Sequence, residues 1–188
     1  SYTKCLLQEL SKSNKIDLIY FRYKTSGHYS NNGNISVIKE YTIRKFDKLL
    51  SLLCLPWVFP LFSARFKWTI NREIQNIIDL GNYDLVYFDF SQTFSYARYL
   101  KHPNKLLMAH DVIGQKYSRS KKYLSRWSRW TEGKMLETAD AIFTFSEKDC
   151  MLFNDWYGVN SQPTTFFLND FVLYAKPDGC GDYFVMFG

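Results

Sequence analysis

Short apolar runs alternate with amphipathic segments along this chain. The run Lys105–Ala109 is almost continuously apolar and ends in the pair His110-Asp111. Near-continuous apolar runs bounded by turn residues are typical of strands that are buried on both faces of a parallel sheet. We expect strands at Ile16–Phe21, Ile35–Ile38, Asp84–Asp89, Lys105–Ala109, Ala141–Phe145 and Thr164–Leu168.

The segments between these runs carry apolar residues at the spacing of a helix. We expect helices at Tyr2–Lys12, Lys45–Leu55, Leu61–Leu80, Ser91–Leu100 and Ser120–Thr138, and one that begins at Glu147 behind an N-cap at Ser146. Gly81-Asn82 is a stop signal for the third of these helices. Strands that alternate with helices predict an α/β fold, with a Rossmann-like doubly wound, mostly parallel sheet flanked by helices.

Composition agrees with a globular chain that can bury a substantial core. Hydrophobic residues make up 46% of its 188 residues and charged residues 22%. The longest apolar run, Leu49–Phe62, has 14 residues and contains two prolines, so it falls short of the roughly 20 residues of a membrane-spanning helix. Burial in the core or insertion into a membrane surface both remain open for it. Four cysteines without a Cys-x-x-Cys motif predict reduced thiols in a cytosolic protein: Cys5, Cys54, Cys150 and Cys180.

The positive charge of the chain is local. Seven basic residues and one acid lie between Lys116 and Lys134, which equals the formal net charge of +6 of the whole chain. Lys122, Arg126 and Arg129 recur at helical spacing beside Trp130. This face is either an ordinary solvated helix face or a contact for anionic lipid headgroups or a phosphorylated acceptor. A basic helix with tryptophans could also bind nucleic acid, but no recognised motif supports that, and we expect no nucleic-acid partner.

Several motifs occur in an order that resembles one enzyme family. They are Asn82–Asp89, Ala109-His-Asp-Val112, the segment Glu137–Asp149 that contains Ala-Asp-Ala-Ile-Phe-Thr-Phe-Ser-Glu, then Tyr157-Gly-Val159 and Tyr183–Gly188. In this order they resemble the N-terminal, acceptor-side domain of GT-B-fold glycosyltransferases, in particular the bacterial family-four nucleotide-sugar enzymes. The resemblance covers residues 82–188 well and residues 1–81 loosely.

The resemblance implies a domain organisation and a reaction. Residues 1–176 would form the acceptor-side domain without the family's first strand, and residues 177–188 the linker and the start of the nucleotide-sugar domain. The whole enzyme would transfer a sugar from a nucleotide-diphosphate donor to a hydroxyl acceptor in cell-envelope polysaccharide or glycolipid synthesis. The acidic donor-binding motif would lie beyond residue 188, so we expect the chain alone to be inactive.

The resemblance also implies partners and a location. The acceptor would be a carbohydrate or a lipid-linked sugar, and neither a cofactor nor a metal ligand is expected. We expect the protein in the cytoplasm, peripherally attached at the inner face of the cell membrane.

His110 is the candidate catalytic residue. A titratable ring at the carboxyl end of a parallel strand lies where ligands bind in open α/β sheets, and the resemblance places a histidine here near the bound sugar. Asp111 either orients the ring or begins the next loop. Ser146 and Glu147 are either a helix cap and its first-turn acid or contacts to the acceptor. His28, in the polar loop Thr25–Asn34, is either a surface residue or a further acceptor contact.

Two other classes of protein are weighed against this prediction. A dinucleotide-binding oxidoreductase needs Gly-x-Gly-x-x-Gly after a strand, and that pattern is absent from the chain. The second alternative is an α/β module that binds nucleic acid or an anionic surface through the basic aromatic helix, without catalysis.

Overall fold

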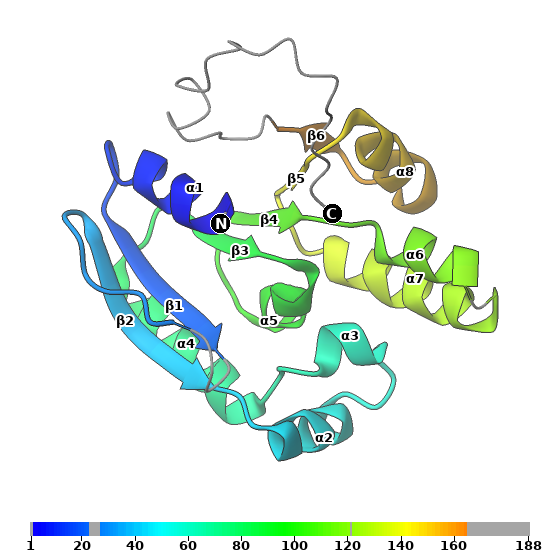
Figure 1. The fold of residues 1–188 in the computed structure, drawn as a ribbon, viewed down its shortest axis with the longest axis horizontal. Coiled ribbons are helices and arrows are strands. Elements are labelled where there is room, and N and C mark those ends of the chain that lie inside the picture. The colour runs from blue at the N-terminus through cyan, green and yellow to red at the C-terminus, as the bar shows by residue number, and fades with distance from the viewer. Residues whose placement is uncertain (1, 23–26, 121, 165–188) are drawn as a thin grey trace, which may run out of the picture.

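The computed structural model describes residues 2–22, 27–120 and 122–164. They form an α/β fold in which helices surround two parallel sheets (Figure 1). The strands are β1 (Ile16–Arg22), β2 (Ile35–Thr42), β3 (Val86–Asp89), β4 (Lys105–Ala109), β5 (Ala141–Thr144) and β6 (Ser161–Pro163). The helices are α1 (Tyr2–Leu10), α2 (Lys45–Cys54), α3 (Pro60–Ser63), α4 (Trp68–Gly81), the 3-10 helix η1 (Ser91–Thr93), α5 (Phe94–Tyr99), α6 (Ile113–Ser120), α7 (Lys122–Leu136) and α8 (Glu147–Tyr157).

The strands divide into a parallel pair, β1-β2, and a parallel sheet in the order β3-β4-β5-β6. The α/β class with parallel strands and flanking helices is confirmed. The expectation of one sheet that includes Ile16–Phe21 is wrong. Strand β1 pairs only with β2 among the described strands, and it contacts the part of the protein around the four-stranded sheet through side chains. Phe21 stacks on Tyr96 of α5 with the ring centroids 5.3 Å apart, and the Tyr83 hydroxyl donates to Asp17 at 2.6 Å. The order β3-β4-β5-β6 follows the chain, so the described strands do not include the reversal of a doubly wound sheet.

The core lies around the four-stranded sheet. Leu107, Met108 and Ala109 are consecutive residues of β4, and all three are buried. Burial of consecutive residues means that both faces of this strand are covered, as is typical of parallel sheets. Helices α5, α7 and α8 supply further buried side chains to this core, among them Phe94, Leu136 and Phe153.

The helix expected over Leu61–Leu80 is two helices, α3 and α4, with a break at residues 64–67. The hydroxyl of Tyr96, a buried side chain of α5, donates to the Arg65 carbonyl at 2.7 Å and accepts the Lys67 N–H at 3.1 Å. A tertiary partner therefore satisfies the backbone groups that a continuous helix would have paired, and the chain can turn here. At its end, α4 stops as expected: Asn82 takes the left-handed conformation, with φ 47°.

Other boundaries also differ from the sequence prediction. The long basic helix begins two residues later than expected, at Lys122, and α6 precedes it. Strand β6 lies before the expected Thr164–Leu168 segment; Thr164 follows the strand, and residues 165–168 lie outside the described residues. The proposed domain boundary at residues 176 and 177 and the Tyr183–Gly188 motif also lie outside them.

Three of the four cysteines fall in the described residues. Cys5, Cys54 and Cys150 are free and half-buried, and Cys180 lies outside the described part. A search of the described helices finds none with the length and apolar character that crossing a membrane requires.

Candidate functional site at the carboxyl edge of the sheet

A histidine and a carboxylate from neighbouring strands meet at the carboxyl edge of the four-stranded sheet. His110 follows the last residue of β4, and its Nε2 lies 2.6 Å from Oδ1 of Asp89, the last residue of β3. The other carboxylate oxygen of Asp89 accepts the Thr3 hydroxyl of α1 at 2.8 Å. Both side chains are largely buried. The carboxylate favours a proton on Nε2, so that Nδ1 is the acceptor nitrogen of the neutral ring.

Two aromatic rings fix the imidazole of His110 in place. Phe90 stacks on it at a centroid distance of 3.8 Å, and the edge of Phe145 meets it at 4.7 Å. Phe90 has a φ of 68°, a conformation that residues with a Cβ rarely adopt. Such backbone positions cost about 1–3 kcal/mol and gather at functional sites. The unusual turn at the end of β3 thus coincides with the stacking of the Phe90 ring on His110.

The structure brings the start of α8 beside His110, as the sequence predicted, because Phe145 directly precedes the cap of this helix. The Ser146 Oγ accepts the Asp149 N–H at 3.1 Å, which confirms its role as N-cap. Glu147 is exposed in the first turn. Roles of these two residues in binding an acceptor stay predictions. Asp111 is exposed at the start of the loop before α6, and the carboxylate that orients His110 is Asp89.

His28 lies against the other sheet. Its Nδ1 is 2.8 Å from Oε2 of Glu40 on β2, and Glu40 also accepts Tyr20 and Arg22 of β1. The hydrogen bond from Tyr20, together with those from Arg22 and His28, lowers the pKa of Glu40 to about 2. His28 is thus tied to an anionic carboxylate on the β1-β2 pair, and its role in acceptor binding stays a prediction.

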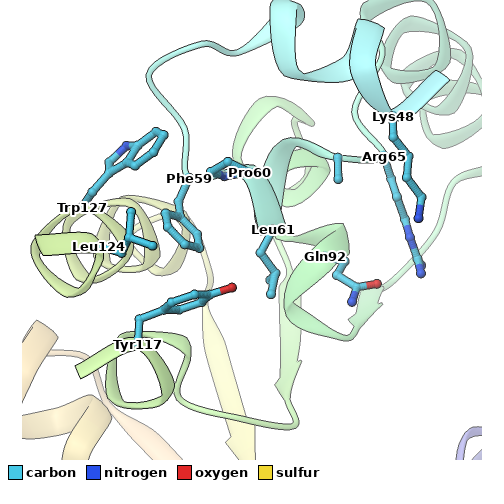
Figure 2. Close-up of a pocket in the computed structure, with 10 residues that line it drawn as sticks. Lys48, Phe59, Pro60, Leu61, Arg65, Gln92, Tyr117, Leu124 and Trp127 are labelled. Carbon is cyan, nitrogen blue, oxygen red and sulfur yellow. The ribbon is translucent and has the colours of Figure 1, made fainter. Parts of the chain in front are cut away.

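A cavity of about 490 Å³ lies among α2, α3, α6 and α7 (Figure 2). Figure 2 shows an aromatic and aliphatic end formed by Phe59, Leu61, Tyr117, Leu124 and Trp127, and a polar end formed by Lys48, Arg65 and Gln92. Gln92 lies in η1, which follows β3, and Tyr117 lies in α6, which follows His110. These two residues come from segments that leave the carboxyl edge, whereas the rest of the lining comes from α2, from α3 with its flanking residues, and from α7. His110 itself does not line the cavity.

The chemistry of the cavity suits a ligand with two different ends. Its volume lies within the roughly 300–1,000 Å³ range of small-molecule sites. Aromatic side chains can pack against a sugar ring or an acyl chain, while an ammonium and a guanidinium can hold a phosphate or carboxylate. A second hollow of about 240 Å³ shares Ala64 and Arg65 with it and reaches the ends of β1 and β2. The two hollows adjoin along the same wall.

The single acid of the basic segment, Glu132, is buried and anchors the loop after His110. One carboxylate oxygen accepts the Ile113 N–H at 2.8 Å, and the other accepts the Gly114 N–H at 2.8 Å and the Tyr157 hydroxyl at 2.6 Å. Burial raises the pKa of Glu132 to about 7 and raises the pKa of Tyr157 as well. The start of α6 is therefore held by a carboxylate from α7 rather than by a cap of its own.

The basic residues predicted on one face of α7 lie in different surroundings. Arg126 is exposed, and Trp130 is 51% exposed. The guanidinium of Arg129 lies 3.9 Å from the centroid of the Trp156 ring in α8, so this cation packs within the protein. The side chain of Lys122 lies outside what the structure describes.

Sequence reasoning missed three residues of the site: Asp89, Phe90 and Glu132. Asp89 carried a readable signal, because it ends the strand expected next to the one that ends at His110. Phe90 and Glu132 carried none, since neither an unusual φ nor the burial of one acid among many bases follows from residue type. Among the described residues no cluster of three metal-ligating side chains is found.

Comparison of the sequence with models of known protein families found no match, and comparison with curated proteins found no significant relative.

Proposed function

We propose that this chain is the acceptor-binding half of a glycosyltransferase that moves a sugar from a nucleotide-diphosphate donor to a hydroxyl acceptor. The observation that carries the proposal is the His110–Asp89 pair at the carboxyl edge, held at 2.6 Å between two aromatic rings. An imidazole can both donate and accept hydrogen bonds, which is the chemistry that recognition of a sugar hydroxyl requires. The sequence motifs around His110, which resemble the family-four enzymes, supply the choice of reaction.

In this proposal the cavity binds the acceptor. Its aromatic end and its cationic end, with Arg65 and Lys48, suit a carbohydrate or a lipid-linked sugar that carries an anionic group. Ser146, Glu147, Asp111 and His28 remain candidates for contacts to this acceptor. The proposal includes peripheral attachment to an anionic membrane surface, to which the local positive charge of residues 116–134 would contribute.

The test is a sugar-transfer assay on the transferase that contains this chain. His110→Ala is expected to lower turnover by about 10²-fold or more, as for other positioned polar groups. His102→Gln is the matched control, because His102 lies before β4, at the opposite end of the strand from His110. Its ring nitrogens contact the carbonyls of Asn104 and Tyr83. Full activity of His110→Ala would remove the basis of the proposal.

Calorimetry on the 188-residue chain tests the assignment to the acceptor half. Nucleotide-sugars should show weak or undetectable binding, since the donor would bind to the second domain. Micromolar affinity for a nucleotide-sugar would contradict this assignment.

The second candidate function is binding of nucleic acid or another polyanion without catalysis. The observation in its favour is that Tyr123, Arg126 and Trp130 are all exposed on α7. Retention of RNA or DNA oligomers on a filter, with strong weakening by salt, would favour this function over transfer of a sugar.

A further inference from the structure

Helix α2 turns its apolar residues toward solvent. Phe46 is 67% exposed, Leu49 59%, Leu50 42% and Leu53 72%. The three leucines lie three, four and seven residues after Phe46, so the four side chains form one stripe along the helix. A contiguous exposed apolar stripe marks a surface that contacts a protein, a ligand or a membrane.

The other side of α2 contacts the body of the protein. Asp47, the one acid in the sequence of α2, pairs with the Lys67 ammonium at 2.7 Å and accepts the Arg44 N–H at 2.9 Å. Ser51 is buried and donates to the Asp47 carbonyl at 2.8 Å. The polar side is thus fastened to the body of the protein. The exposed side keeps its leucines and carries no acid.

A further exposed aromatic residue follows α2 in the chain. Trp57 is 54% exposed, and its carbonyl accepts the indole N–H of Trp127 in α7 at 2.8 Å. The backbone at Trp57 therefore contacts the basic helix. We call this surface the α2 face: Phe46, Leu49, Leu50, Leu53 and Trp57.

We propose that the α2 face inserts into the headgroup region of an anionic lipid bilayer, with the axis of α2 parallel to the membrane surface. A stripe of leucine and phenylalanine with a neighbouring tryptophan is the composition of helices that lie in this region. Charge favours a bilayer over a protein partner, because Arg44, at the start of α2, and Arg126, one residue before Trp127, are both exposed cations. Such cations are attracted to anionic headgroups.

This inference deepens the membrane attachment that the proposed function includes, and it rests on that part of the proposal alone. It assigns insertion to α2, which contains the first residues of the apolar run Leu49–Phe62, and leaves contact with the headgroups to the basic face of α7. Charge on α7 would then strengthen the encounter with the membrane, and apolar burial of the α2 face would hold the protein there.

The experiment is flotation of the 188-residue chain with vesicles made of equal parts phosphatidylglycerol and phosphatidylcholine. The double variant Leu49→Gln/Leu53→Gln is expected to bind about tenfold more weakly or worse, since two exposed leucines no longer enter the apolar region. Leu80→Gln is the matched control, because Leu80 is 85% exposed on α4, outside the α2 face. It should bind like the unmodified chain. Amide hydrogen exchange in residues 45–54 should slow when vesicles are added.

Three results would overturn the inference. The first is equal vesicle binding by the double variant and the unmodified chain. If the variant Lys122→Gln/Arg126→Gln/Arg129→Gln loses binding in that case, membrane attachment stands and only its assignment to α2 fails. The second is absence of vesicle binding by the unmodified chain, which would refute both membrane attachment and its assignment to α2. The third is that the unmodified chain forms a dimer and does not bind vesicles, and that the double variant is a monomer. The α2 face would then be a contact between two copies of the chain.

Discussion

Replacing Glu132 by glutamine should remove a pH dependence from the stability of this protein. Glu132 is fully buried, with its two oxygens on the N–H groups of Ile113 and Gly114 and on the Tyr157 hydroxyl. Burial raises the pKa of Glu132, and the charge of Asp111 raises it to a smaller extent, whereas the three hydrogen bonds lower it. The net result is a rise in the pKa from 4.5 to about 7. Glutamine has nearly the same shape as the protonated carboxyl group and does not ionise.

The sign and size follow from proton binding. Between pH 4.5 and about 7 the unfolded chain releases the Glu132 proton while the folded protein keeps it. The free energy of unfolding therefore falls as the pH rises through this window. One pKa unit corresponds to about 1.4 kcal/mol, so the shift to about 7 corresponds to a loss of about 3 kcal/mol. The stabilisation is complete below pH 4.5 and is lost above about pH 7.

Urea unfolding followed by tryptophan fluorescence, at a series of pH values across this window, measures the effect. The free energy of unfolding of the unmodified chain minus that of Glu132→Gln should decrease by about 3 kcal/mol from the acidic to the neutral end. Other titrating groups are common to both proteins and largely cancel in this difference. Glu9→Gln is the control, because Glu9 is an exposed acid of α1. The difference in the free energy of unfolding between the unmodified chain and this variant should change little with pH. A difference that stays constant would show that the three hydrogen bonds balance burial, and one that grows with pH would show that they outweigh it; either result would refute the reasoning.

Two further substitutions test the packing around the site. Tyr96→Phe leaves the Lys67 N–H without its acceptor and should lower the free energy of unfolding by about 1–3 kcal/mol; an unchanged urea midpoint would contradict the explanation of the helix break. Gly114→Ala would place a Cβ 2.4 Å from Cγ of Arg129 and should destabilise by about 1–3 kcal/mol, measured by thermal unfolding. Gly133→Ala is its comparison, because the nearest atom lies at 3.0 Å, and equal effects of the two would refute the steric argument.

Local rules account for most of the secondary structure. Strand β4 occupies the expected residues, Lys105–Ala109; a short apolar run of this kind suits a strand that is covered on both faces. The ends of α4 and α8 follow from backbone chemistry: Asn82 and Gly158 take the left-handed conformation there, and the Ser146 side chain caps the start of α8. Each of these signals acts within a few residues of the chain.

The sequence prediction was wrong where residues far apart in the chain determine the local structure. The break between α3 and α4 depends on the Tyr96 hydroxyl, about thirty residues further along the chain. The separation of β1 from the larger sheet depends on side chains that pack β1 against α5. Apolar periodicity alone placed the residues 61–80 in one helix, since it contains no information about partners outside the segment.

By itself the sequence determined the α/β class, the strand that ends at His110 and the local concentration of positive charge, because each depends on residue type and spacing along the chain. Only the tertiary structure decided the partner of His110, the burial of Glu132 and the exposure of the α2 face. Asp89 and His110 are 21 residues apart and meet because β3 and β4 pair in parallel. The leucines of α2 face outward, while Asp47 on its other side pairs with Lys67. Which side of a helix is buried, and which charge is desolvated, depends on the groups that pack against it, and those are chosen by the fold as a whole.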